Sequence, residues 1–226
     1  MEKLIINKSK FEPVKTMLVV FGCVLVNFLG KRFAAALALP LWLDCVGTVF
    51  AAYVLGPVSG AVVGCTCNII YSFWNANSLI YGITSIFVGI STGIAARKKY
   101  FETFFKSASL AGGVTIGSVL ISTVLNLLLY GGNTGNLWGD GVRDYLLEKG
   151  LSGVLASAVG ELYLDFLDKV VTVLLLYCLI KVGRTLRGRR RIKRGIAAAL
   201  ALLLCGGTLS LSADAANIGN ASEAAA

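Results

Sequence analysis

Four ionisable side chains interrupt a hydrophobic run in the last third of the chain: Glu161, Asp165, Asp168 and Lys169. The segments on either side, 151–160 and 170–180, carry no charge. The spacing i, i+4, i+7, i+8 places all four groups on one face of a helix. A charge at membrane depth costs about 2.5–3.5 kcal/mol on insertion scales. We therefore expect this face to point into a helix bundle, toward water, a ligand or the other charged groups.

The pairing of these groups separates two hypotheses. Asp165 and Lys169 are four residues apart and can form an ion pair along the helix. Glu161 and Asp168 then need other partners, such as Lys31, Arg32 or a cationic group of a substrate. A purely internal ion-pair network that locks the helices together is the alternative, and it also explains the deeper pair, Asp168 and Lys169. Glu161 and Asp165 are thus the better candidates for ligand contacts.

The composition predicts an all-α integral membrane protein. The 226 residues have a mean hydropathy of +0.77, with 56% hydrophobic and 15% charged residues, whereas a soluble domain carries about 25% charged residues. The apolar stretches are continuous and do not alternate, which favours helices over a barrel. A Gly-Pro turn at Gly56–Gly60 separates two of the expected helices. We predict a six-transmembrane-helix bundle with spans at about 16–30, 41–55, 61–73, 79–96, 110–130 and 151–180, plus a seventh hydrophobic helix at 195–213.

The basic residues predict the domain organisation and the orientation. Lys and Arg give a formal net charge of +9 and gather in the N-terminal segment, at 97–99 and at 184–194. Such clusters indicate cytoplasmic loops and anionic lipid headgroups, and no aromatic surface accompanies them to suggest nucleic acid. The predicted parts are a cytoplasmic segment (1–15), the membrane bundle (16–182), a basic cytoplasmic linker (183–194) and a hydrophobic helix with a short tail (195–226).

This orientation brings the polar and aromatic side chains toward the outer side. Lys31 and Arg32 also fall outside, against the positive-inside rule, either as headgroup contacts or as functional groups. Aromatic rings could stack on a flat ligand, and carboxylates could hold an amine or ring N–H. The predicted substrate-binding residues are Trp42, Asp44, Asn68, Tyr71, Trp74, Tyr81, Asn126, Tyr130, Glu161 and Asp165.

The same sequence disfavours catalysis and metal binding. It has no His, and its six Cys lie inside apolar segments. Cys65-Thr-Cys67 is not a metal-ligand spacing, so we expect no metal, no other cofactor and no enzyme activity. The glycines of "GPVSGAVVG" precede no Lys-Ser/Thr pair and form no phosphate loop; they favour close helix packing or a docking surface. Uphill transport would need an ion gradient or another subunit.

The stretch "LPLWLDCVGTVFAAYVLGPVSGAVVGCTCNII", residues 39–70, resembles the substrate-binding S components of energy-coupling factor (ECF) transporters. The shared pattern is a Leu-Asp opening, a Gly-Pro turn, then Gly-Ala-x-x-Gly followed by an Asn. "ELYLDFLDKVVTVLLLYCLIK" resembles the Asp-Lys-bearing last helix of one uncharacterised branch of that family. The resemblance covers about residues 16–181.

The resemblance implies a multi-pass protein of a bacterial cell membrane that binds a vitamin or similar micronutrient in an outward pocket. The loop after the first helix, which would contain Lys31, Arg32 and Trp42, would cap that pocket as a gate. The implied partners are a transmembrane T subunit, two ATPase subunits and the lipid bilayer. Family members dock through small residues on the first helix, typically Ala-x-x-x-Ala, where this chain offers only Gly22 and Cys23.

Two other functions stay open. An ion-coupled secondary transporter could use Asp165 and Asp168 as a cation or proton site. A membrane sensor domain could precede a signalling part, although the chain contains no catalytic segment. Uptake that requires T and ATPase subunits separates the importer from both.

Overall fold

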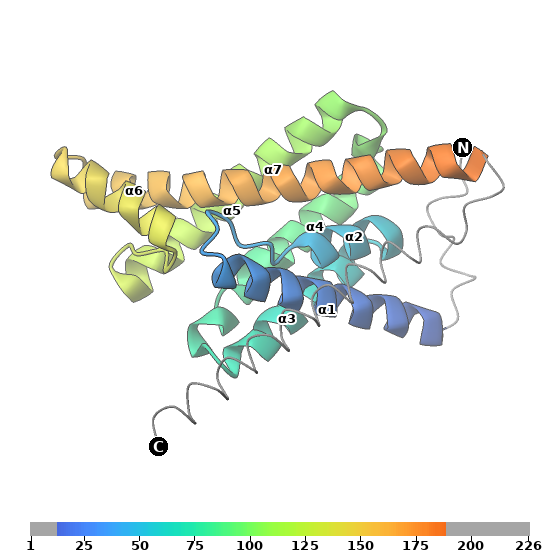
Figure 1. The fold of residues 1–226 in the computed structure, drawn as a ribbon, viewed down its shortest axis with the longest axis horizontal. Helices are drawn as coiled ribbons and strands as arrows, with labels where there is room; N and C mark the ends of the chain where they lie inside the picture. The colour runs from blue at the N-terminus through green and yellow to red at the C-terminus, as the bar shows by residue number, and fades with distance from the viewer. Residues whose placement is uncertain (1–12, 189–226) are drawn as a thin grey trace, which may run out of the picture. The chain divides into compact units, whose positions relative to one another are not determined.

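The structure is a computed structural model that describes residues 13–188 (Figure 1). Every regular element in this range is a helix. The chain divides into two compact units, residues 1–179 and 180–226. Of the second unit, the structure describes only the C-terminal end of the last helix. Residues 1–12 of the predicted N-terminal segment (1–15) and residues 189–194 of the predicted basic linker (183–194) lie outside the described residues, as does the whole predicted helix at 195–213.

The first helix is longer than its sequence predicted. Helix α1 covers Pro13–Ala36. Pro13 suits the first helical turn, because N–H groups there have no hydrogen-bond acceptor within the helix and the absence of an N–H costs nothing. The segment "FAAA" extends the helix beyond Gly30, because Ala is the strongest helix former. The prediction that Lys31 and Arg32 lie on a gating loop is therefore wrong: both lie near the C-terminal end of α1, and the loop that follows covers residues 37–45.

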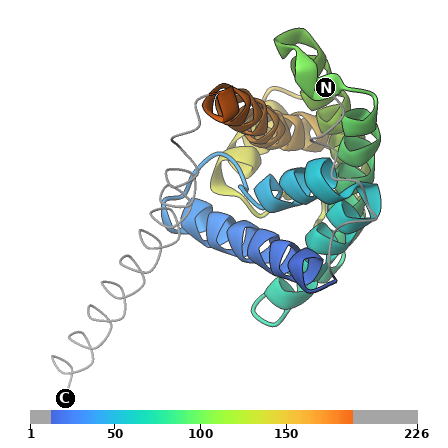
Figure 2. The same cartoon turned by 90° about the vertical axis from the view of Figure 1, so that its right-hand side faces the viewer.

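A tight hairpin of two short helices lies at the centre of the first unit. Helix α2 (Val46–Leu55) and helix α3 (Pro57–Ser72) are joined by Gly56 alone. Its φ of 105° is a conformation that glycine adopts readily because it lacks a Cβ. The predicted turn is confirmed, but α3 begins at Pro57 instead of Ala61. Figure 2 shows α2 with α1, α3 and α4 around it. Accordingly Val49, Ala51 and Ala52 are almost fully buried.

Two further α-helices follow the hairpin. A short 3₁₀ helix, η2 (Ala76–Leu79), leads into α4 (Gly82–Arg97), and η3 (Tyr100–Glu102) leads into α5 (Phe104–Tyr130). The Asn75 side chain accepts a hydrogen bond from the Asn77 N–H, and that of Thr103 accepts one from the Lys106 N–H. Such caps satisfy amide groups that the first turn leaves without partners.

The segment predicted as a loop with a short charged stretch contains a further helix. Helix α6 covers Leu137–Glu148 and begins at Asn136, whose side chain accepts a hydrogen bond from the Trp138 N–H at 3.0 Å. Helix α7 then covers Gly153–Gly188 and carries the four ionisable groups. The fold thus has one more helix than the predicted spans of residues 16–182 required.

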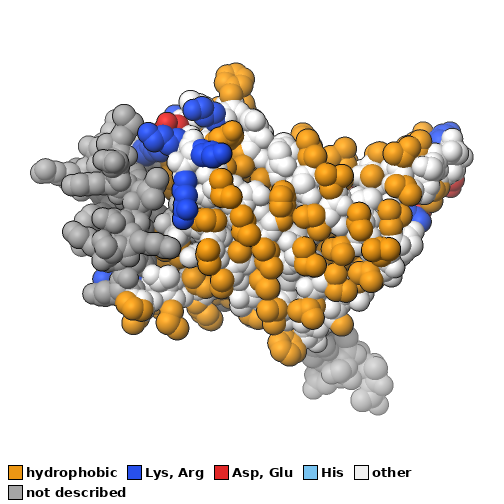
Figure 3. All heavy atoms as spheres, turned by 180° about the vertical axis from the view of Figure 1, so that it is seen from behind, with side chains coloured by type: hydrophobic (Ala, Val, Ile, Leu, Met, Phe, Trp, Pro, Cys, Tyr) orange, Lys and Arg blue, Asp and Glu red, His pale blue; other side chains and the backbone are white. Residues whose placement is uncertain are grey.

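Within residues 13–188, three helical segments are long and apolar enough to cross a membrane: Pro13–Ala36, Ala76–Arg97 and Phe104–Tyr130. Helix α2 has ten residues, which at 1.5 Å per residue span about 15 Å, half the hydrocarbon thickness. Hydrophobic side chains cover a broad band of the surface in Figure 3, and the largest group of Lys and Arg lies at one end, with a few more at the other. The structure therefore supports an all-helical membrane protein; six and seven spans stay predictions.

Candidate functional site

A cavity of about 640 Å³ lies among α1, the loop 37–45, α3, α4, α5 and α7. It is lined near the N-terminal end of α4, by Tyr81 and Thr84, and near the C-terminal end of α5, by Tyr130. The opposite ends of these two helices carry exposed basic residues, at 97–99 and at Lys106. The cavity and the basic cluster thus lie at opposite ends of the same helix pair.

The cavity lining contains seven of the ten predicted substrate-binding residues: Trp42, Asp44, Tyr71, Tyr81, Tyr130, Glu161 and Asp165. They come from the loop 37–45, α3, the start of α4, α5 and α7. Lys31 also lines the cavity from α1, although Arg32 is exposed and does not.

The charged face of α7 points into the bundle, as its spacing predicted. Glu161, Asp165, Asp168 and Lys169 are between 0% and 5% exposed. The Lys169 ammonium lies 2.8 Å from Asp165 Oδ1 and 3.0 Å from Asp168 Oδ2. The predicted Asp165–Lys169 pair is confirmed, and Lys169 also serves Asp168. One ammonium group therefore compensates two carboxylates.

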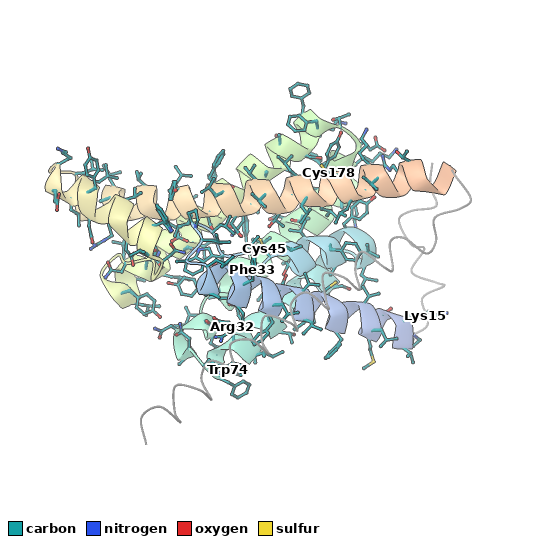
Figure 4. All side chains as sticks on the ribbon, viewed as in Figure 1. Lys15, Arg32, Phe33, Cys45, Trp74 and Cys178 are labelled. Atoms are coloured by element: carbon teal, nitrogen blue, oxygen red, sulfur yellow. The ribbon has the colours of Figure 1, made fainter. Side chains whose placement is uncertain are left out.

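Asp168 connects α7 to the loop that lines the cavity. Its Oδ1 accepts a hydrogen bond from the Leu43 N–H at 2.7 Å, and its Oδ2 accepts one from the Cys45 thiol at 3.1 Å. Leu43 has a φ of 51°, which is unfavourable for a residue with a side chain. In Figure 4, Cys45 lies among the inner side chains beside α7. Asp168 thus positions the loop and does not line the cavity.

Asp165 differs from Asp168 in one respect. Its Oδ2 is buried and makes no hydrogen bond to the protein. Most buried carboxylate oxygens have a partner, because desolvation without a hydrogen bond is costly. Since Asp165 lines the cavity, a donor on a molecule inside the cavity could supply that hydrogen bond.

Glu161 belongs to a separate chain of hydrogen bonds between α7, α5 and α4. The Asn126 side-chain amide donates to Glu161 Oε2 at 2.9 Å, and the Tyr81 hydroxyl donates to Asn126 Oδ1. The Tyr81 and Tyr130 rings are nearly parallel, with centroids 6.4 Å apart. Asn126 is fully buried and orients these groups without lining the cavity.

Lys31 pairs with a different residue from those the sequence suggested. Its ammonium lies 3.5 Å from Asp44 Oδ2 and 4.5 Å from the centre of the Tyr71 ring. The hypothesis that Lys31 or Arg32 compensates Glu161 or Asp168 is therefore wrong. The pair holds the end of α1 to the loop 37–45 and leaves Glu161 with neutral hydrogen-bond partners.

Two other predicted site residues lie outside the lining. Trp74 is 67% exposed, packs on Phe28 and points away from the helices in Figure 4. Asn68 is buried and donates to Ser85 Oγ at 2.7 Å and to the Gly64 carbonyl oxygen. It joins α3 to α4. Both residues were predicted from their position near the end of an expected helix, and that position alone does not bring their side chains into the cavity.

Several polar lining residues were missed by sequence reasoning. They are small hydroxyl and amide residues on η2, α4, α5 and the loop before α6, namely Ser78, Thr84, Ser85, Ser122, Thr134 and Asn136. Lys169, which the sequence assigned to the structural network, also lines the cavity. The sequence carries only a weak signal for the hydroxyl residues, because Ser and Thr also occur in membrane helices as ordinary packing residues.

Asp44, Cys45 and Asp168 offer ligand atoms within 4.8 Å of one another, a separation that could suit a metal ion. Both carboxylates already have a cationic partner, Lys31 for Asp44 and Lys169 for Asp168. A metal ion would have to compete with these ammonium groups. The arrangement is therefore that of an ion-pair network, and its chemistry is binding through charge, hydrogen bonds and aromatic rings.

Comparison with models of protein families, with curated proteins and with solved structures found no match for this chain.

Proposed function

We propose that this chain is the substrate-binding subunit of an ECF-type importer. It captures a vitamin or similar micronutrient from outside the cell and delivers it together with a transmembrane T subunit and two ATPase subunits. The observation that carries the proposal is the cavity of about 640 Å³, which combines aromatic rings with buried carboxylates inside a bundle of apolar helices. Cavities of about 300–1,000 Å³ hold small molecules or cofactors.

The position of the cavity also supports capture from outside. By the positive-inside rule, the basic cluster at 97–99 faces the cytoplasm. The cavity lies toward the other ends of α4 and α5, so the same rule assigns it to the outer side. The loop 37–45, which lines the cavity, suits the role of a gate in this arrangement, with Trp42 on the loop and Lys31 at the helix end before it.

The need for partners follows from the energetics of uphill transport. The glycine-rich segment 56–64 lacks the Lys-Ser/Thr pair of a phosphate loop. Binding in a cavity supplies no energy for accumulation, so an ATP-driven step must come from other subunits. This is the division of labour that the resemblance of residues 39–70 to S components implies.

The test is uptake with and without the partners. The small molecule that co-purifies with the full-length protein is identified by mass spectrometry, and its uptake into proteoliposomes is measured with and without T and ATPase subunits. ATP-dependent uptake that requires those subunits supports the proposal. Uptake driven by a proton or sodium gradient in their absence would replace it with an ion-coupled transporter, for which the buried Asp165–Lys169–Asp168 cluster is the specific argument. Ligand binding without transport in either condition would favour a sensor domain.

A further inference from the structure

The cavity region carries more negative than positive groups. The carboxylates that line or adjoin it are Asp44, Glu161, Asp165 and Asp168. The ammonium groups that contact them are those of Lys31 and Lys169. With all groups ionised, four negative charges face two positive charges, which leaves an excess of two negative charges.

The excess is concentrated on Glu161 and Asp165. Glu161 receives its hydrogen bond from the Asn126 amide, which carries no charge. Asp165 shares Lys169 with Asp168, and its second oxygen has no hydrogen-bond partner although the side chain is 2% exposed. Residues four apart on a helix have Cβ atoms about 5–6 Å apart, so one ligand can contact both.

The aromatic lining fits the same ligand chemistry. Aromatic faces attract cations through their quadrupole. Lys31 already lies over the Tyr71 ring at 4.5 Å, whereas Trp42, Tyr81 and Tyr130 contribute further rings to the lining. A ligand carboxylate or phosphate would instead meet the uncompensated carboxylates at close range.

From these observations we infer that the cavity selects an organic cation, with N–H groups that hydrogen-bond to Asp165 and Glu161 and an apolar or flat body that contacts the tyrosines. An amidine, a protonated amine or a protonated amino-heterocycle has this chemistry. The inference rests on the proposed function, because it assigns the ligand class of the same cavity.

The experiment uses three probes of similar size and shape that differ in charge: benzamidine (positive), benzamide (neutral) and benzoate (negative). Binding to the purified full-length protein is measured by titration calorimetry after removal of co-purified ligand. We expect benzamidine to bind at least tenfold more tightly than the other two. Equal affinities, absence of binding by all three, or tighter binding of benzoate would overturn the inference.

Two substitutions and one control assign the effect to residues. Asp165→Asn and Glu161→Gln should each weaken benzamidine binding at least tenfold. Glu161→Gln keeps an oxygen for the Asn126 amide and so serves if Asp165→Asn fails to fold. Asp144→Asn is the control, since Asp144 lies outside the cavity lining with a side chain that is 62% exposed. Unchanged affinity in a folded Asp165 or Glu161 variant would contradict the assigned contacts.

The outcomes separate this inference from the proposed function. If benzamidine is preferred but uptake needs no T and ATPase subunits, the importer proposal is wrong and the cation site stands. If those subunits drive uptake of an anionic micronutrient, the importer proposal stands and the cation site is wrong.

Discussion

At the scale of single residues, Lys169 links the two hypotheses for the charged face of α7. Its ammonium contacts Asp165, which lines the cavity, and Asp168, which holds the loop 37–45. The structural ion-pair network and the proposed ligand site therefore share side chains. The sequence presented them as alternatives because it could not show that one lysine reaches both carboxylates.

Replacing Lys169 should destabilise the protein. Lys169→Met leaves Asp165 and Asp168 buried without a cation, and removal of one partner from a buried ion pair costs about 3–5 kcal/mol. We expect a clear fall in the melting temperature of the detergent-purified protein, followed by circular dichroism.

Neutralising a carboxylate in the Lys169→Met variant tests whether uncompensated charge causes the loss of stability. The double variant Lys169→Met with Asp165→Asn should recover part of the lost stability, because one of the two uncompensated charges is removed. Arg184→Met, which removes an exposed cation, is the control. A double variant less stable than Lys169→Met alone would show that charge compensation is not the cause.

At the scale of elements, the contact between α3 and α4 depends on glycine. A Cβ at Gly89 would lie 2.4 Å from the Ala61 nitrogen and from the Gly60 carbonyl carbon, and one at Gly93 would lie 2.4 Å from Pro57 Cα. The helices can approach this closely only without side chains at these positions. The packing interpretation of "GPVSGAVVG" is thus confirmed for Gly60, which lies against Gly89, and for Gly64, where a Cβ would lie 2.8 Å from Ser85 Cβ. The sequence interpretation did not include these partners on α4.

Gly89→Ala should destabilise the contact between α4 and α3, because the added methyl group overlaps backbone atoms of α3. Overpacking of this kind costs about 1–3 kcal/mol. Thermal unfolding measures the loss, with Gly113→Ala on α5 as the matched control. A Cβ at Gly113 meets nothing within 4 Å, so that substitution should stabilise its helix by up to about 1 kcal/mol. Equal effects of the two substitutions would contradict the proposed close contact.

The loop 37–45 is held in a strained conformation by side chains from α6 and α7. Ala38 has a φ of 47°, and its carbonyl oxygen accepts a hydrogen bond from Trp138 Nε1 at 2.7 Å. Asn136 Nδ2 donates to the Leu39 carbonyl oxygen at 3.2 Å. Together with the bond from Leu43 to Asp168, these contacts position Trp42 and Asp44 at the cavity.

Ala38→Gly should stabilise the protein, because glycine adopts a positive φ without the cost of about 1–2 kcal/mol that a side chain adds. The greater entropy of glycine in the unfolded chain offsets part of this, so a net gain of about 0.5–1 kcal/mol is expected. The melting temperature measures it, with Ala108→Gly inside α5 as a control that should lose stability. A loss of stability on Ala38→Gly similar to that on Ala108→Gly would show that Ala38 is not strained.

At the scale of the first compact unit, the separation of charge and cavity predicts the orientation in the membrane. Ala76 lies at the cavity end of the segment 76–97, and Lys98 follows its other end. Lys and Arg favour the cytoplasmic side of a membrane protein. The cavity end should therefore face outward.

Cysteine labelling in whole cells tests this orientation. A membrane-impermeant maleimide should label the Ala76→Cys variant in intact cells, and the Lys98→Cys variant only after permeabilisation. The unsubstituted chain, which contains six Cys, provides the background. The reverse pattern would place the cavity on the cytoplasmic side and remove the argument for capture from outside.

The sequence by itself determined the properties that depend on composition and local spacing. Apolar stretches and the low charge content predicted apolar helices, because these features act within one helix. The i, i+4, i+7, i+8 spacing predicted both the buried face of α7 and the Asp165–Lys169 pair. The Gly-Pro turn was predictable for the same reason, since Gly56 and Pro57 impose their conformations locally.

Only the tertiary structure decided which side chains meet across helices. The pairing of Lys31 with Asp44, the anchoring of Leu43 by Asp168 and the outward position of Trp74 depend on how α1 ends and how the helices rotate about their axes. Successive residues of a helix are about 100° apart around its axis. An error of a few positions in where a helix ends therefore changes which side chains are expected to face the cavity. The open hydrogen-bonding position on Asp165 could be found only in this way, because it exists only relative to the side chains that the fold brings around it.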